Sequence, residues 1–274
     1  MGRVLVSKAF TEEELKIVLD PSIILSKDLK SKLPRLKKVD YANQLRIKNG
    51  INPVKTNNVD HNYFSIPNLE NSYWAGFISA AGCVYEQGIY KSVKISLAIK
   101  DLEHLNKFCE MTGANIPTFG ESSYYQKVNK YASVSVRSKQ WAIDLKENFN
   151  ITCRKTKTNK PPTLSYENSL AFIAGYIDGD GSYSWNIKQN SPTLSILGTK
   201  EVLEWIQSVV GLSAKITYSK GCYYTNYISN KAIYFRSRYI DLPIPFLKRK
   251  INNWEYVFGG ELEMKTSSRS YYEI

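Results

Sequence analysis

Two acidic residues, Asp178 and Asp180, stand at the end of an apolar segment and just before Gly181. The carboxyl end of a helix disfavours anions, so two acids at such an end are costly without a cation. Carboxylates placed there could hold Mg²⁺ or a similar ion against a phosphate and activate a water for attack on phosphorus. The alternative is that both acids only terminate a helix, with Gly181 as its cap.

The segment that carries these acids occurs twice. AGYIDGDGSY at 174–183 matches AGFISAAGCV at 75–84, 99 residues earlier, but Ser79 and Ala81 replace the two acids in the first copy. The Ala-Gly pair in each copy has almost no side chain, which lets two helices pack with their backbones close together. We therefore expect the two helix ends to meet at the centre of a duplicated domain.

Composition favours a nucleic-acid partner. The chain has 274 residues, 37 Lys and Arg against 25 Asp and Glu, a formal charge of +12 and a pI near 9.3. Such a charge points to a polyanion, although a basic surface kept for solubility is the alternative. Two histidines and four cysteines without a C-x-x-C pair argue against a zinc knuckle, a Ser-His-Asp site or a disulfide scaffold. We expect oxygen ligands for any metal, a reducing intracellular location, and neither a signal peptide nor a membrane span.

Residues 1–51 are expected to form three short helices. Thr11 and Glu14 have capping-box spacing, Ser26 is the expected cap of the second helix, and Gly50 ends the third. The pattern resembles Myb-like helix-turn-helix modules, in which the third helix would present basic residues to DNA. A small helical cap with a solvated basic face is the alternative. The basic residues assigned to DNA binding here are Arg35, Lys37, Lys38, Arg46 and Lys48. Residues 52–70 are polar and contain two prolines, which predicts a flexible linker.

From residue 71 onward the same order of elements is predicted twice. Apolar residues alternate with polar ones in the expected strands, and the expected helices are amphipathic. This pattern predicts antiparallel sheets with one face on helices and one face open to a charged ligand. Helices are expected at 72–81, 101–111, 139–149, 169–180 and 200–210, and strands at 92–99, 131–138, 183–189, 193–198 and within 213–237.

The second motif is specific enough to indicate a family. AGYIDGDGS, preceded by SLAFI, resembles the LAGLIDADG motif of homing endonucleases, and WAGFISAAGC resembles a degenerate twin of it. The resemblance implies an α+β fold in which two αββαββα repeats, 71–160 and 161–274, form a DNA-binding saddle. It also implies a monomer, encoded in an intron in many relatives, that cuts a long double-stranded DNA site with Mg²⁺ or another divalent cation.

The resemblance assigns roles to individual residues. Asp180 would be the metal ligand, and the backbone carbonyls of Gly179 and Ala80 would also face the metals. Lys155 and Lys250 match the active-site lysine of each repeat, where a cation stabilises charge on the phosphate. The alternative for either lysine is one more phosphate-positioning contact.

The catalytic position of the first repeat is Ala81, which cannot bind a cation. Three explanations are open: natural loss of the acid, a nicking enzyme that uses Asp180 alone, and a deliberate replacement of Asp by Ala. We favour the last, because Gly82 and Lys155 are kept. The main alternative function is a non-cleaving protein, either a DNA-binding regulator or an intron RNA maturase.

The strand after each motif is expected to contact DNA bases. If the strand after Gly181 lies on the groove, one face is polar while Tyr183, Trp185 and Ile187 face the core. The residues assigned to this contact are Ser184, Asn186, Lys188, Tyr85 and Gln87. Abundant Lys, Asn, Ile and Tyr indicate an AT-rich genome, so the expected location is the cytoplasm of a bacterial or phage-infected cell, with an organelle as the alternative.

Overall fold

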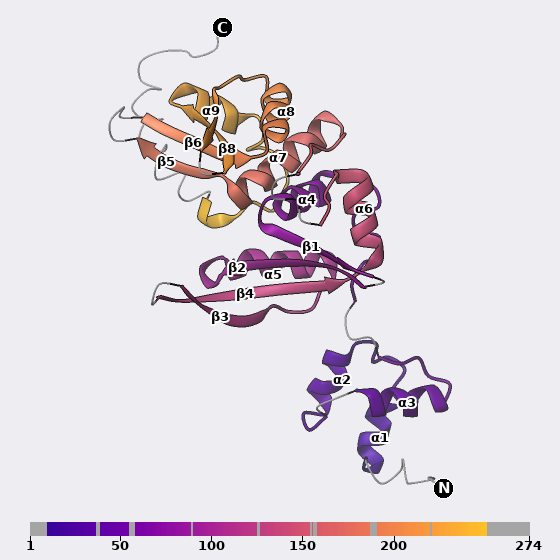
Figure 1. Cartoon of the computed structure of the whole chain (residues 1–274). Coiled ribbons are helices and arrows are strands. Elements are labelled where there is room, and N and C mark those ends of the chain that lie inside the picture. The colour runs from indigo at the N-terminus through magenta and orange to yellow at the C-terminus, as the bar shows by residue number, and fades with distance from the viewer. Residues whose placement is uncertain are drawn as a thin grey trace. The chain divides into compact units, whose positions relative to one another are not determined.

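The chain consists of two compact units, each described here by itself. The structure, a computed structural model, describes residues 10–36, 39–54, 58–88, 90–124, 127–153, 155, 158–186, 191–219 and 221–250. The small unit comprises residues 1–60 with 113–115, and the large unit comprises the rest (Figure 1). Among the described residues, no helix is long and apolar enough to cross a lipid bilayer.

Three helices form the small unit. They are α1 (Glu12–Val18), α2 (Ser26–Lys32) and α3 (Asp40–Lys48). The predicted capping box is present, because the Thr11 hydroxyl accepts from the backbone of Glu14 while the Glu14 carboxylate accepts from the backbone of Thr11. Ser26 is not the cap of α2, since the cap position is Leu25 and no side chain bonds there. Gly50 follows α3 with φ 70, the left-handed conformation predicted for it.

The prediction of a basic DNA-binding face on the third helix is wrong in part. The helix begins only at Asp40, so Arg35 precedes it, and Lys37 and Lys38 lie outside the described residues. Arg46 is 1% exposed and forms part of the interior instead of a DNA-binding surface. Its guanidinium donates to the backbone carbonyls of Val18, Asp20, Ile23 and Asn52 at 2.7 to 3.0 Å. Of the five basic residues assigned to DNA binding, Arg35 and Lys48 are exposed.

The predicted linker is only partly a tether. Val54 is buried in the core of the small unit. Phe64 is fully buried in the large unit, where its ring packs edge-on against Trp141 at 5.1 Å and Phe149 at 6.1 Å. The side-chain amide of Asn148 donates to the carbonyl of Phe64 at 2.9 Å. The prolines and polar residues of this range predicted a linker, although Val54 and Phe64 within it are buried.

Two long helices form the centre of the large unit. These are α4 (Leu69–Ala81) and α7 (Tyr166–Asp180), which contact each other along their length (Figure 1). A Cβ on Gly76 would lie 1.9 Å from the carbonyl oxygen of Phe172, and a Cβ on Gly175 would lie 1.9 Å from that of Tyr73. Only glycine permits this approach, so the prediction from the Ala-Gly pairs is confirmed.

Two four-stranded antiparallel sheets of the same topology accompany the central helices. The strand order is β1-β2-β4-β3 in one sheet and β5-β6-β8-β7 in the other. The first sheet contains β1 (Gly82–Gln87), β2 (Tyr90–Ala98), β3 (Thr118–Tyr124) and β4 (Lys127–Arg137). The second sheet contains β5 (Ser182–Asn186), β6 (Ser191–Gly198), β7 (Ile216–Ser219) and β8 (Cys222–Ile228).

One face of each sheet packs on helices. The first sheet contacts α5 (Leu102–Thr112), which follows the short 3₁₀ turn η2 (Ile99–Asp101), and α6 (Lys139–Phe149). The second contacts α8 (Lys200–Val210) and α9 (Asn230–Ser237). The strands expected within 213–237 are β7 and β8, and the rest of that range contains a helix that was not predicted. This helix, α9, buries three residues at helical spacing, Ala232, Phe235 and Arg236. It follows the last strand of the second sheet, as α6 follows the last strand of the first.

Candidate active site and nucleic-acid interface

The ends of α4 and α7 meet, as expected from the duplication. A Cβ on Gly179 would lie 2.4 Å from the Cβ of Ala80, so these two residues lie against each other. Gly82 and Gly181 follow the two helices with extended φ values of −90 and −81. Gly181 is therefore not a left-handed cap. A side chain is excluded there because a Cβ would lie 2.7 Å from the carbonyl oxygen of Ile177.

The two acids of the second motif have different surroundings. Asp178 is 6% exposed, and its Oδ2 accepts hydrogen bonds from the Tyr73 hydroxyl at 2.7 Å and from the Leu247 backbone at 2.8 Å. Burial raises the pKa of Asp178, opposed by these two hydrogen bonds. Asp180 is exposed as a residue, but partial burial of its carboxyl group raises its pKa, against the attraction of Lys155 and Lys250.

The two predicted lysines take equivalent positions at the two helix ends. Lys155 Nζ donates to the carbonyl of Gly82 at 2.8 Å, and Lys250 Nζ donates to that of Gly181 at 2.6 Å. Lys250 also donates to the carbonyl of Ile177 at 2.6 Å. Both ammonium groups therefore neutralise the negative end of a helix. Burial lowers the pKa of Lys155, and it lowers the pKa of Lys250 to about 8 against the attraction of Asp178.

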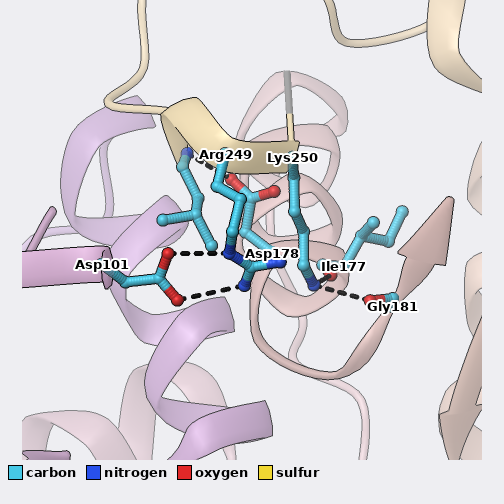
Figure 2. A network of polar contacts seen from close by, with 7 residues as sticks. Asp101, Ile177, Asp178, Gly181, Arg249 and Lys250 are labelled. Carbon is cyan, nitrogen blue, oxygen red and sulfur yellow. Dashed lines mark hydrogen bonds and ion pairs between the residues drawn. The ribbon is translucent and has the colours of Figure 1, made fainter. Parts of the chain in front are cut away.

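Residues 247–250, of which 248–250 are helical, form contacts with both repeats. Figure 2 shows Arg249 facing Asp101 and Lys250 facing the end of α7. The Arg249 guanidinium binds the Asp101 carboxylate through two hydrogen bonds of 2.8 and 3.0 Å. Leu247 donates to Asp178, and the Lys250 backbone donates to the carbonyl of Leu247 at 2.8 Å. These contacts fix where the Lys250 ammonium lies.

A buried aromatic network extends from Asp178 into the first repeat. The Nε2 of His104 lies 3.1 Å from the Tyr73 hydroxyl, which donates its own proton to Asp178. Nε2 is therefore the protonated nitrogen of a neutral ring. Burial lowers the pKa of His104 to about 3, so this histidine is no acid or base near neutral pH. Neither Tyr73 nor His104 was identified from the sequence, because nothing in its pattern pairs Tyr73 with Asp178, 105 positions away, or with His104, 31 positions away.

A pocket of about 220 Å³ lies beside Asp180. Its lining residues come from both repeats: Ser79, Ala80, Lys155, Asn159, Tyr176, Asp180, Leu197, Gly198, Thr199 and Cys222. Ala81, the partner position of Asp180, contributes no oxygen ligand. Within the described ranges, no three His, Cys, Asp or Glu side chains gather as a metal cluster. Asp180 is thus the one carboxylate that lines this pocket.

Three of the five predicted DNA-reading residues, Tyr85, Gln87 and Ser184, lie on exposed sheet positions. Tyr85, 53% exposed, and Gln87 lie on the face of β1 opposite to that of the buried Val84. Ser184 is exposed on β5, and Tyr183 beside it is buried as predicted. Asn186 ends β5, but its side chain lies outside the description, and Lys188 and Ile187 lie outside the described residues.

The strand register adds basic residues that were not assigned individually. Tyr85 pairs with Ser92, which pairs with Arg137, and Cys83 pairs with Lys94. Partners in register share one face of a sheet. Lys94 and Arg137 therefore lie on the same open face as Tyr85. Their alternation with buried valines was visible in the sequence, but their alignment across strands was not.

Comparisons with known proteins support this fold. The homing endonuclease I-WcaI, solved bound to its DNA recognition sequence, is similar with a TM-score of 0.50 and 14% identity, over 67% of this chain and 85% of that one. The chain has the LAGLIDADG homing-endonuclease fold. No family model and no curated protein matches its sequence.

Two further solved structures are less similar. The LAGLIDADG meganuclease I-AabMI, bound to uncleaved DNA, has a TM-score of 0.48 and 11% identity, over 73% of this chain and 92% of that one. A variant of I-DMOI in complex with its target DNA, in the presence of 2 mM Mn, has a TM-score of 0.43 and 17% identity, over 68% and 97%.

Proposed function

We propose that this chain binds a long double-stranded DNA site and hydrolyses a phosphodiester bond in it. The observation that carries the proposal is an exposed acidic residue, Asp180, at the end of a motif helix beside two buried lysines, in a chain of the LAGLIDADG fold. DNA-bound homing endonucleases share the fold. The net charge of +12 supports a polyanionic substrate.

The residues around Asp180 fit a hard divalent cation. Carboxylate and carbonyl oxygens are the ligands that Mg²⁺ prefers, and a cation offsets the cost of an acid at a helix carboxyl end. Asp180 would hold the ion together with the backbone carbonyls of Gly179 and Ala80. A divalent ion at such a site polarises a phosphate oxygen and lowers the pKa of a bound water.

The two lysines act on the substrate phosphate and on the helix ends. Each is held at a fixed distance from a helix carboxyl end by its carbonyl partner, so neither pays much ordering entropy when a phosphate approaches. Lys155 interacts electrostatically with Asp180 and lines the same pocket. It is the residue we assign to stabilising negative charge on the phosphate, and Lys250 is its counterpart in the second repeat.

We infer that cleavage is restricted to one strand. The position equivalent to Asp180 is Ala81, whose methyl group supplies no ligand. One carboxylate can therefore serve one scissile bond, and the expected product is a nicked duplex. This holds whether Ala81 arose naturally or by deliberate replacement of an aspartate.

The open sheet faces are the proposed reading surfaces. Side chains such as Gln87 can bond base edges, whereas Lys94 and Arg137 neutralise phosphates. In the small unit, Arg35 and Lys48 remain as proposed phosphate contacts, and the Myb-like resemblance makes this unit a second DNA-binding module. The four cysteines are free thiols, which supports a reducing intracellular compartment, bacterial, phage-related or organellar.

A non-cleaving function is the second candidate, and Ala81 favours it. A protein with one incomplete site could bind DNA as a regulator or assist intron RNA folding as a maturase. Both would lose affinity steeply with added salt, so salt dependence does not separate them from an enzyme.

The test is a comparison of the chain with Asp180→Asn on a DNA site selected by binding. We expect both to bind equally and only the parent chain to nick the site with Mg²⁺ or Mn²⁺. Equal nicking by the two proteins would refute the role of Asp180. Binding without scission by the parent chain, together with preference for a folded intron RNA over duplex, would favour the maturase alternative.

A further inference from the structure

Asn159 is held rigidly beside the pocket of Asp180. Its side chain is 6% exposed, and its Nδ2 donates to the Ser79 hydroxyl at 2.8 Å. Its backbone carbonyl accepts from the Thr199 hydroxyl at 2.7 Å. One contact reaches the end of α4 and the other the start of α8. The amide of Asn159 therefore has little freedom to reorient.

The oxygen of this amide has no hydrogen-bond partner among the described residues. Asn159 Oδ1 is buried and unpaired, and its residue lines the same pocket as Asp180 and Lys155. A buried acceptor left without a partner destabilises the folded chain. The pocket, at about 220 Å³, has room for about seven waters or for a hydrated ion. A hydrogen-bond donor or a cation that came within reach of this oxygen from the pocket would satisfy it.

The first repeat uses this position differently from the second. Asp178 occupies the place in α7 that Ser79 occupies in α4, and the Asp178 Oδ2 already accepts from Tyr73 and Leu247. In the first repeat, Ser79 instead orients a neutral amide. The amide oxygen offers a ligand that Mg²⁺ and Mn²⁺ accept in proteins.

We propose that Asn159 Oδ1 is a ligand, directly or through one water, of the divalent cation that Asp180 holds. The inference rests on the proposed function. The charge of Asp180 is offset by Lys155 and Lys250, and Ala81 contributes nothing, so the cation needs a further oxygen. Asn159 supplies it from the basic segment that follows Lys155.

Mn²⁺ binding to the full chain without DNA tests the proposal, with the loss of the free-ion electron-spin signal as readout. Asn159→Leu is expected to weaken Mn²⁺ binding at least about fivefold, since it keeps the shape and removes the oxygen. Asn159→Asp is expected to tighten it at least about fivefold, because a carboxylate replaces the amide. Asn129→Asp is the matched control, an exposed asparagine of β4 that does not line the pocket. It is expected to bind like the parent chain.

Asp180→Asn separates this inference from the proposed function. If it abolishes Mn²⁺ binding while both Asn159 variants bind like the parent chain, the role of Asn159 is overturned and the metal site of Asp180 stands. If Asp180→Asn has no effect, or the parent chain shows no saturable binding, the proposed metal site fails, and with it the role of Asn159. Asn159→Asp decides the question if Asn159→Leu does not fold.

Discussion

The hydroxyl of Tyr73 donates a 2.7 Å hydrogen bond to Asp178, and so joins the motif helix of one repeat to that of the other. Asp178 thereby becomes a structural residue, whereas Asp180 two positions later remains exposed. The two acids have different roles because successive residues on a helix point about 100° apart. Asp178 and Asp180 therefore lie on nearly opposite sides of the helix, one buried and one exposed.

Tyr73→Phe is expected to destabilise the large unit by about 1–3 kcal/mol, because it leaves a buried carboxylate with one hydrogen bond fewer. Denaturant unfolding of the large unit measures this. Tyr85→Phe is the matched control, since that hydroxyl is on an exposed side chain, and it is expected to change stability by less than about 0.5 kcal/mol. Equal effects of the two replacements would contradict the role of Tyr73.

Gly76→Ala is expected to cost about 3 kcal/mol or more, or to prevent folding, because the added carbon would overlap the Phe172 carbonyl in a tightly packed interface. Gly50→Ala tests backbone strain alone, since it has φ +70 and open space around it. That control is expected to cost only about 1 kcal/mol. A Gly76→Ala protein as stable as the Gly50→Ala protein would show that α4 and α7 are not this close.

Lys250 is expected to make stability rise with pH above 8. Its pKa is lowered from 10.5 to about 8 in the folded chain, so between these values the unfolded chain binds more protons. Stability therefore rises from about pH 8 to 10.5, at up to about 1.4 kcal/mol per pH unit, and is level below about pH 8. The measurement is the free energy of unfolding at pH 8 to 9.5 for the parent chain and for Lys250→Met. The difference between them is expected to grow with pH, and a constant difference would contradict the buried ammonium.

Arg46→Met is expected to destabilise the small unit by about 3 kcal/mol or more, since it leaves buried carbonyls without a donor. Hydrogen exchange of α1–α3 in the full chain reports the change. Lys48→Met, on an exposed residue of the same helix, is expected to leave exchange unchanged and to weaken DNA binding instead. If Arg46→Met weakened DNA binding without faster exchange, Arg46 would be a DNA contact after all.

The fold was largely predictable because its signals are local and repeated. The duplicated segments fixed the two central helices, and alternation in segments such as β2 gave strands with one buried face. The helix α9 was missed, since its short apolar spacing resembles that of the strands before it.

The candidate site was predictable only where a residue acts through its own motif. Asp180 ends its motif helix, and Lys155 and Lys250 lie beside the two helix ends, while their catalytic roles stay predictions. The partners of Asp178 and the burial of Arg46 depend on contacts between segments distant in sequence, which residue patterns do not contain. Asn159 lies in a basic segment whose lysines are the residues that the family resemblance assigns to the site. Its proposed role depends on the orientation of one side-chain amide, which the sequence does not show.

The most direct test of the account is cleavage of a supercoiled plasmid carrying the selected binding site, with Mg²⁺, by the chain and by its Ala81→Asp variant. We expect the chain to produce nicked circles and the variant to produce linear DNA, because the restored carboxylate completes the second site. If neither protein cuts although both bind, Asp180 is not a catalytic metal ligand and the chain is a binding protein. If the chain itself already linearises the plasmid, Ala81 does not limit cleavage and the one-strand account is wrong.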